Sequence, residues 1–427
     1  MAGRKQSGRD SLSATFEDDH TWPDASCNSF QRALCPLLVA GQCFALMPVS
    51  GLTGHDASTL RFRWRSPRVA YSVLSLVGIL LHLYFCLREL CTAHRVTYSA
   101  CAPAVFFAVT FLATIFFMFL ARKWPQIVSE WQTVEHTMLK FHGYPRNFGH
   151  RCKFCAASML TASTVEHMMA MYSCLLRALP YSAGGVDVIR AFYTIWFEQV
   201  FKATDYALWK ALLLQVSNFV ATFTWSYMDM FVTLVSMALT QKYLQLYERL
   251  LAFRGEVTPP AFWREARELY ENLCCLTRTV DDHISHLVLL SLTSDLYFIC
   301  LQLFNSLTNV HSLYGYVFFF YSFGYLLFRA CLMCFCASFV NEASQKPKGV
   351  LYAVPAASYD TEVERFIDHV TTSEVALTGF RLVKLKRLLI LTVIGSIATY
   401  ELLLVQQDNG QGLDSEQAQN SSNVILA

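Results

Sequence analysis

Seven apolar runs, each long enough to cross a lipid bilayer, constrain this chain more than any other feature of its sequence. A membrane-spanning α-helix needs about 20 mainly apolar residues, because the hydrocarbon core is about 30 Å thick. The runs lie at residues 70–90, 104–121, 157–176, 211–240, 285–307, 312–338 and 388–406. We therefore predict an all-α membrane protein with seven transmembrane helices.

Composition supports this fold class and excludes others. The chain has 427 residues, of which 54% are hydrophobic and only 15% are charged, whereas an ordinary soluble domain has about 25% charged residues. A net charge of +2 argues against nucleic acid as a partner, because binding several phosphates requires a strong basic excess. The polar N-terminal segment lacks the apolar run of a cleaved signal peptide, so the first hydrophobic helix should act as its own signal.

A further apolar segment, residues 33–49, is ambiguous. It is just long enough to span a membrane, but it contains Pro36, Gln42 and Pro48. We expect a partly buried helix that lies beside the bundle and does not cross the membrane.

The distribution of Lys and Arg between the predicted loops gives the orientation, because these residues in short loops stay on the cytosolic side. Segments 1–69, 122–156, 241–284 and 339–387 carry eight, six, six and seven of them, whereas 91–103, 308–311 and 407–427 carry one, none and none. The N-terminus is therefore predicted in the cytosol and the C-terminus outside, where Asn420 would begin an accessible N-glycosylation triplet. The loop 177–210 carries four basic residues and is the exception, which its length permits.

The connecting segments divide the chain into five predicted regions. They are a cytosolic N-terminal region (1–69) with the membrane-associated helix at 33–49, helices one to six with a ligand pocket and cytosolic extensions (70–338), a cytosolic anchor segment (339–387), helix seven (388–406) and an extracellular tail (407–427). Charged and apolar residues alternate at helical spacing over 241–284, which predicts that helices four and five extend into the cytosol. Over 359–385 we predict an amphipathic helix leading into helix seven, with Val363, Phe366, Ile367 and Val370 on its apolar side.

The fifteen cysteines show no Cys/His spacing of the kind that binds a metal. Most lie in or beside apolar runs, where a thiol behaves as a small hydrophobic group. We expect no metal site and no cofactor. Cys91 and Cys101 share one predicted external loop and are the pair placed to form a disulfide, but free thiols are the favoured state.

Polar and aromatic side chains recur at helical spacing on four of the predicted helices. They are Ser163, Thr164, Glu166 and His167 on helix three; Gln215, Asn218, Thr222, Trp225 and Asp229 on helix four; Ser291, Asp295, Gln302 and Asn305 on helix five; and Tyr314, Phe318, Tyr321, Tyr325 and Arg329 on helix six. An ionisable side chain at bilayer depth costs about 2.5–3.5 kcal/mol on insertion scales, so it should face the bundle interior or a water-filled cavity.

Two interpretations of these polar faces remain open. One is a hydrated pocket in the outer half of the bundle, where carboxylates bind adjacent hydroxyls and aromatic rings stack on C–H surfaces, as a sugar ring requires. The other is hydrogen bonding between helices with no ligand, which we favour for the Ser, Thr and Asn residues. We favour a ligand role for the buried carboxylates, with Arg329 or His167 as structural partners, and a core role for the helix-six aromatics. The candidate ligand-binding residues are Asp229, Trp225, Glu166, His167, Asp295, Tyr321, Tyr325 and Trp196, with Glu198 as a second external-loop residue that would cover the pocket.

Helix seven has a different character. It carries a thin polar stripe of Thr392, Ser396, Thr399 and Gln406, with Leu403 between them. Small hydroxyls among apolar residues make a poor pocket but a reasonable lining for a hydrated pore, in which leucines gate by dewetting. Packing by small residues explains the same stripe equally well.

The C-terminal residues ThrTyrGluLeuLeuLeuValGln at 399–406 resemble the TYhhhhhQ motif of helix seven in insect gustatory receptors, and the glutamate resembles the sugar-receptor branch. Thr399, Tyr400, Glu401 and Gln406 carry this motif. Supporting segments occur in the same order, namely FALMPVSG at 44–51, RFRWRS at 61–66, STVEH at 163–167, WSYMDMF at 225–231 and TSEVALTGFRLVKLKRLLI at 372–390. The resemblance covers about residues 30–407.

The resemblance implies a sugar-gated cation channel of the plasma membrane, assembled as a homotetramer or as a heteromer with other gustatory receptor subunits. Helices two to six would hold the sugar, with Asp229, Trp225, Glu166 and His167 at positions similar to the family's sugar-contacting faces. Helix seven would line the pore, and Gln406 matches the pore-mouth glutamine. The family motif usually continues with Phe where this chain has Gln407. The candidates for the hydrophobic gate are therefore Leu402 and Leu403.

Three rival classes are less consistent with the sequence. A receptor coupled to G proteins would have its N-terminus outside, opposite to the predicted orientation. A transporter for a small polar solute remains the main alternative, but paired broken helices and an internal repeat are not found. An intramembrane enzyme would need ligand spacing such as HxxxH, so we expect no enzyme.

Overall fold

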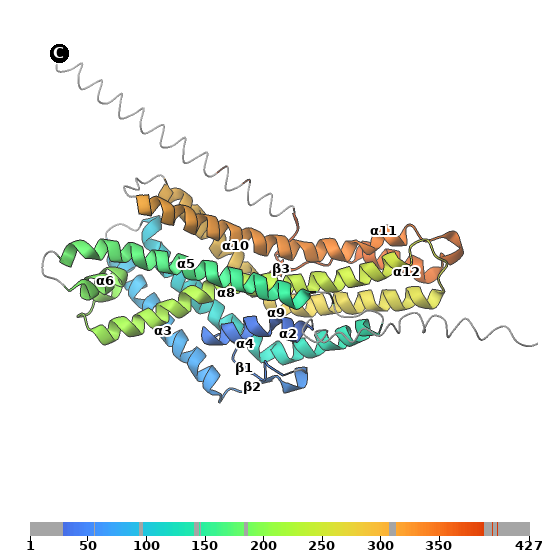
Figure 1. The fold of residues 1–427 in the computed structure, drawn as a ribbon, viewed down its shortest axis with the longest axis horizontal. Helices are drawn as coiled ribbons and strands as arrows, with labels where there is room; N and C mark the ends of the chain where they lie inside the picture. Colours follow the sequence, from blue (N-terminus) through green and yellow to red (C-terminus); the bar gives the residue numbers. More distant parts are fainter. Residues whose placement is uncertain are drawn as a thin grey trace, which may run out of the picture.

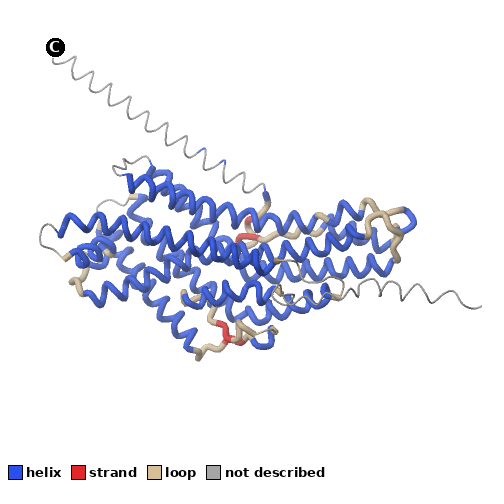
Figure 2. Tube along the Cα trace, in the orientation of Figure 1, coloured by secondary structure: helices blue, strands red, loops and turns tan. Residues whose placement is uncertain are grey.

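The computed structural model describes residues 29–387, except 55, 94–96, 141–144, 146, 183–186 and 307–312, and in addition residues 395 and 399. Within this part of the chain, long helices run side by side along the long axis of the molecule (Figure 1). Strands are limited to two short hairpins, coloured red in Figure 2. The predicted all-α class is confirmed.

Six long helices coincide with the first six predicted spans. They are α3 (Pro67–Thr92), α4 (Tyr98–Leu139), α5 (Phe148–Ser182), α8 (Leu208–Ala252), α9 (Pro260–Ser306) and α10 (Leu313–Gln345). By length and composition, α3, α4, α9 and α10 are apolar enough to cross a membrane. The seventh predicted span, 388–406, lies outside the described residues apart from 395 and 399, so the count of seven stays a prediction.

Helix α8 forms the centre of the bundle. Nearly every side chain between Ser226 and Leu239 is buried, because α4, α5, α9 and α10 all pack against this helix. By contrast, one face of α3 exposes Leu74, Val77 and Leu81. An apolar face of this kind is what a lipid-facing helix presents.

The ambiguous segment forms α2 (Phe30–Cys43), which packs beside the bundle against α5, α8 and α4. This confirms the predicted partly buried helix, but the helix ends at Cys43 and not at residue 49. Ala45 and Met47 have φ angles of 60° and 50°, and the side-chain amide of Gln42 donates to the carbonyl of Met47 at 3.1 Å. The chain then enters a hairpin of β1 (Val49–Ser50) and β2 (Arg61–Phe62), with a 3-10 helix, η2 (Ala57–Thr59), between them.

The two ends of the long axis carry different structures. Figure 1 shows α6 (Val188–Trp196) at one end, with α11 (Pro347–Leu351) and α12 (Thr361–Thr372) at the other. The short helix α7 (Glu198–Phe201) follows α6, and η3 (Ala356–Ser358) joins α11 to α12. Helices α8 and α9 continue to this second end, which confirms their predicted helical extension.

The predicted helix at 359–385 is only partly correct. Helix α12 begins after Asp360, whose carboxylate accepts from the backbone N–H groups of Glu362 and Val363 at 3.0 Å, and its apolar face buries Val363, Phe366 and Val370. It ends at Thr372, and residues 378–384 form a hairpin of β3 (Thr378–Gly379) and β4 (Val383–Lys384). The difference arises because Phe380 and Arg381 adopt φ angles of 52° and 59°, which a helix excludes.

The cysteines in the described residues are free thiols, including Cys91 and Cys101. The expectation that the cysteines show no CxxC pairs is wrong. Such pairs lie on two of the long helices, at Cys152 and Cys155 of α5 and at Cys331 and Cys334 of α10, and these four thiols are free as well.

Candidate functional site

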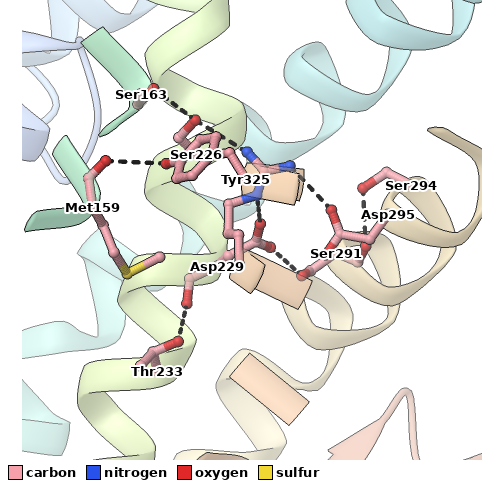
Figure 3. A network of polar contacts seen from close by, with 10 residues as sticks. Met159, Ser163, Ser226, Asp229, Thr233, Ser291, Ser294, Asp295 and Tyr325 are labelled. Atoms are coloured by element: carbon pink, nitrogen blue, oxygen red, sulfur yellow. Dashed lines mark hydrogen bonds and ion pairs between the residues drawn. The ribbon is translucent and has the colours of Figure 1, made fainter. Parts of the chain in front are cut away.

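A buried arginine of α10 connects three helices in the interior of the bundle. The Arg329 side chain is 1% exposed. Its Nε lies 2.5 Å from Oδ2 of Asp229 on α8, and its Nη2 donates to Oδ1 of Asp295 on α9 at 3.1 Å. Nη1 donates to the Ser226 hydroxyl at 3.1 Å (Figure 3). Two of the predicted ligand-binding carboxylates are therefore brought together by Arg329, which the sequence named as their structural partner.

Neighbouring side chains complete this cluster. The Ser291 hydroxyl donates to Asp229, the Ser226 and Ser163 hydroxyls lie 2.9 Å apart, and the Trp225 ring centroid lies 4.1 Å from the Arg329 guanidinium carbon. A guanidinium over an indole face is stabilised by a cation–π interaction. Trp225 therefore stabilises the Arg329 guanidinium in this structure, and its ring also contacts Phe298.

The cluster holds two carboxyl groups for a single guanidinium. Oδ2 of Asp295 has no hydrogen-bond partner among the described protein groups. The contact between Nε of Arg329 and Oδ2 of Asp229 is an ion pair whose angle is too poor for a hydrogen bond. A buried carboxylate oxygen without a donor carries a large desolvation cost, so Asp295 offers an acceptor to a water molecule or to a ligand hydroxyl.

Glu166 belongs to a second polar group. The hydroxyl of Ser322 on α10 donates to Glu166 Oε1 at 2.6 Å, and the side-chain amide of Gln302 on α9 donates to the Ser322 hydroxyl at 3.2 Å. Oε1 of Gln302 is buried without a partner among the described groups. The predicted carboxylate on helix three is therefore interior, whereas Thr164, predicted on the same face, is exposed.

The tyrosines of α10 fasten this helix to α5. The hydroxyls of Tyr314, Tyr321 and Tyr325 donate to backbone carbonyls of α5 at 2.6, 3.0 and 3.0 Å. Their spacing of seven and four residues places them on one helix face. The favoured core interpretation of these side chains agrees with this packing.

His167 and Trp196 meet in an aromatic group between α5, α6 and α8. The His167 ring centroid lies 5.7 Å from that of Phe219 and 6.3 Å from that of Trp196. His167 is 4% exposed, and its Nε2 has no partner among the described groups. The structure thus brings Trp196, at the end of α6, against His167 of α5, and its covering role stays a prediction.

A cavity of about 690 Å³ lies between the C-terminal end of α5 and the helices α6 and α7. Arg177, Tyr181, Arg190, Thr194 and Glu198 supply its polar lining. Glu198 was predicted from the sequence, but this cavity was not. The one signal for it was the set of basic residues in the loop 177–210. Ser226 and Ser322 were also missed, because a serine in a helix has no distinguishing pattern.

Helix α9 also binds the β3–β4 hairpin, which precedes the predicted seventh span in the sequence. Asp281 accepts the Thr378 backbone N–H at 2.6 Å and the Thr378 hydroxyl at 2.7 Å. Burial raises the pKa of the Asp281 carboxyl, and the two hydrogen bonds from Thr378 oppose this rise. The Phe380 backbone N–H donates to the Ser285 carbonyl at 3.0 Å, and Arg381 pairs with Asp282.

The predicted pore and motif residues Tyr400, Glu401, Leu402, Leu403, Gln406 and Gln407 lie outside the described residues. Thr399 is described, is exposed, and donates its hydroxyl to the Gly395 carbonyl at 2.8 Å.

The arrangement of the helices matches that of an insect chemoreceptor. The insect olfactory receptor OR5 from Machilis hrabei, in complex with eugenol, has the same fold with a TM-score of 0.64, at 13% identity and with 87% of this chain and 97% of that chain covered. A second structure of the same olfactory receptor gives a TM-score of 0.63. The protein is therefore an all-helical membrane protein of the insect chemoreceptor fold.

The sequence comparison is more specific. The chain belongs to the trehalose receptor family, which matches residues 19–416. It is 34% identical over 388 residues to the gustatory receptor for sugar taste 64f of Drosophila melanogaster, covering 90% of this chain and 82% of that protein. It is 33% identical to gustatory receptor 5a for trehalose of the same fly, covering 88% and 85%. The resemblance to the sugar branch of gustatory receptors is confirmed, and this family is one of receptors and not of enzymes.

Proposed function

We propose that this chain is a subunit of a sugar-gated cation channel in the plasma membrane of chemosensory neurons. Four subunits, either identical or including other gustatory receptors, would surround one pore. Membership of the trehalose receptor family and the names of the Drosophila relatives support the sugar as ligand.

The proposed topology has seven spans, with the N-terminus in the cytosol and the C-terminus outside. Four described helices, α3, α4, α9 and α10, are long and apolar enough to span a membrane, α5 and α8 are proposed as two further spans, and the loop charges support the orientation. The position of α6 and α12 at opposite ends of the long axis is consistent with external and cytosolic placement of these two segments.

One observation carries the ligand proposal, namely that buried polar atoms in the interior lack partners. They are Oδ2 of Asp295, Oε1 of Gln302 and Nε2 of His167. Native proteins leave few such groups unsatisfied, and the hydroxyls of a sugar can donate to or accept from all three. We propose that the sugar lies among α5, α8, α9 and α10, in reach of Asp229, Trp225, Glu166, His167, Asp295, Tyr321, Tyr325 and Trp196.

The proposed gating mechanism acts through α9. This helix carries Asp295 in the interior and, further along, Asp281, which binds the hairpin at Thr378. If a sugar favours a position of α9 that moves the hairpin, it shifts the population towards an open pore. Thr399, Leu402, Leu403, Gln406 and Gln407 would line or gate that pore on helix seven.

The test is to express the chain in cells without sugar responses, alone and with related subunits, and to record currents during application of mono- and disaccharides. The proposal predicts an inward cation current that appears with at least one sugar. Uptake of labelled sugar without current would favour the transporter class instead. A C-terminal tag that is accessible only from the cytosol would reject the topology.

A further inference from the structure

A cavity at the start of α3 is lined by arginines. Its volume is about 460 Å³, and Arg61, Arg63, Trp64 and Arg122 contribute to its wall. Arg61 belongs to β2, Arg63 and Trp64 follow this strand, and Arg122 projects from α4. The three guanidinium groups thus come from two separate parts of the chain and face one space.

These arginines are not neutralised by the protein. Arg61, Arg63 and Arg122 are exposed, no acidic residue lines the cavity, and none of the three forms an ion pair within the described residues. Arg65 and Arg68 follow directly in the sequence. Planar guanidinium groups bind phosphate through paired hydrogen bonds, so the cavity is complementary to a phosphate-bearing group.

An apolar groove continues from this cavity along α3. The groove has a volume of about 650 Å³ and is lined by Trp64, Val73, Leu74 and Val77 among others. Trp64 belongs to both linings, is 57% exposed, and is held at its edge by Phe62 with ring centroids 5.1 Å apart. Tryptophan prefers the boundary between headgroups and acyl chains.

The cavity lies where a spanning helix meets the membrane surface. Helix α3 begins at Pro67, next to the arginines, and its other end is near α7, where Lys202 bridges to Glu89. The basic end of α3 is the predicted cytosolic end, and the inner leaflet carries the anionic lipids of a cell membrane.

We propose that this cavity and groove bind one phospholipid with an anionic headgroup from the inner leaflet. The phosphate groups of the lipid contact Arg61, Arg63 and Arg122, Trp64 lies at the level of its glycerol backbone, and an acyl chain follows Val73, Leu74 and Val77. The site is separate from the Arg329 cluster, and its occupancy does not depend on which ligand opens the channel.

The test is native mass spectrometry of the purified full-length protein in detergent, titrated with dioctanoyl phosphatidylinositol 4-phosphate. Arg63→Gln combined with Arg122→Gln should weaken binding roughly thirtyfold, since each arginine near an anionic lipid contributes a factor of about five. The matched control, Arg254→Gln combined with Arg264→Gln, removes two exposed arginines elsewhere on the chain and should leave binding unchanged. Equal loss in both variants, or no loss in the first, would overturn the proposal.

Two further measurements distinguish a lipid from a free phosphate compound. Trp64→Ala should weaken binding of the lipid but not of soluble inositol 1,4-bisphosphate, because only the lipid reaches the groove. Dioctanoyl phosphatidylcholine should bind far more weakly than the anionic lipid. If the soluble compound binds as tightly as the lipid, or if phosphatidylcholine binds equally well, the proposed lipid site is wrong.

Discussion

At the scale of single residues, the cluster around Arg329 is the most consequential feature of the interior. The guanidinium contacts Asp229, Asp295 and Ser226, which lie on two other helices. Burying an unpaired charge costs far more than the net contribution of the pair. Arg329 therefore offsets the cost of burying the two carboxyl groups, and Oδ2 of Asp295 keeps no hydrogen-bond partner among the described protein groups.

Replacing either partner of this cluster should have unequal effects. Arg329→Ala leaves two buried carboxylates without a cation and should destabilise the protein by about 3–5 kcal/mol. Asp295→Asn keeps the pair of Arg329 with Asp229 and a hydrogen-bonding side chain of the same size, so it should cost much less. Thermal unfolding of the detergent-purified variants measures both, and equal losses would contradict the assigned role of Arg329 as the partner of both carboxyl groups.

At the scale of secondary-structure elements, α2 and the β3–β4 hairpin show how close packing shapes the fold. A Cβ added at Gly41 would lie 2.5 Å from the Tyr227 hydroxyl oxygen, and Tyr227 is fully buried on α8. Glycine is therefore required for α2 to approach the bundle centre this closely.

Gly41→Ala should destabilise the protein by about 1–3 kcal/mol, because the buried ring has little room to move. Gly324→Ala is the matched control, since no neighbouring atom of the described residues lies within 4 Å of the added Cβ and alanine favours helix by about 0.5–1 kcal/mol. Unfolding midpoints should move in opposite directions in the two variants, and a neutral Gly41→Ala would show that α2 packs less tightly.

The attachment of the hairpin to α9 gives a second prediction. Asp281→Ala leaves the Thr378 N–H without its buried acceptor, at a cost of about 1–3 kcal/mol, whereas Asp282→Ala removes an exposed ion pair worth at most about 1 kcal/mol. Hydrogen exchange at residues 378–384 should therefore accelerate strongly in the first variant and little in the second. In Asp281→Ala, the sugar-evoked current should fall while sugar binding is retained. An unchanged current would show that the hairpin takes no part in gating.

The base of the hairpin should respond to acid. Lys384 and Lys386 lower the pKa of the Glu374 carboxyl to about 2. A depressed carboxyl pKa adds stability above its unfolded value of about 4.3, and this stability is lost as the pH falls towards 2. Exchange of the hairpin amides, corrected for intrinsic rates, should accelerate from pH 5 to pH 3 in the native protein. Glu374→Gln should abolish this change, and persistence of the change would assign it to another group.

The sequence predicted the long elements well and the short ones poorly. Apolar runs located six long helices because a bilayer span requires about 20 consecutive, mainly apolar residues, although the helices continue beyond these runs. The end of α2 at Cys43 and the hairpin after Thr372 were missed, because strands of two residues have no periodicity and positive φ angles at Phe380 and Arg381 depend on tertiary contacts with α9. Similarly, burial cost identified Asp229 and Asp295, but the partner of each carboxylate is a property of the packed helices.

At the scale of the whole molecule, the chain has the fold of an insect chemoreceptor and belongs to the trehalose receptor family. The interior of its helical bundle contains buried polar atoms without hydrogen-bond partners among the described groups. Helix α9 connects that interior to the β3–β4 hairpin, which precedes the predicted seventh span. The central claim is that a sugar in the bundle opens a cation pore.

The most direct measurement is single-channel recording from the purified protein in a planar bilayer, with sugars added to the side that carries the C-terminus. The account predicts discrete cation-carrying openings whose frequency rises with the concentration of at least one sugar, and which disappear in Arg329→Ala while Asp282→Ala retains them. Saturable sugar binding to the same preparation, with no sugar-dependent conductance, would contradict it.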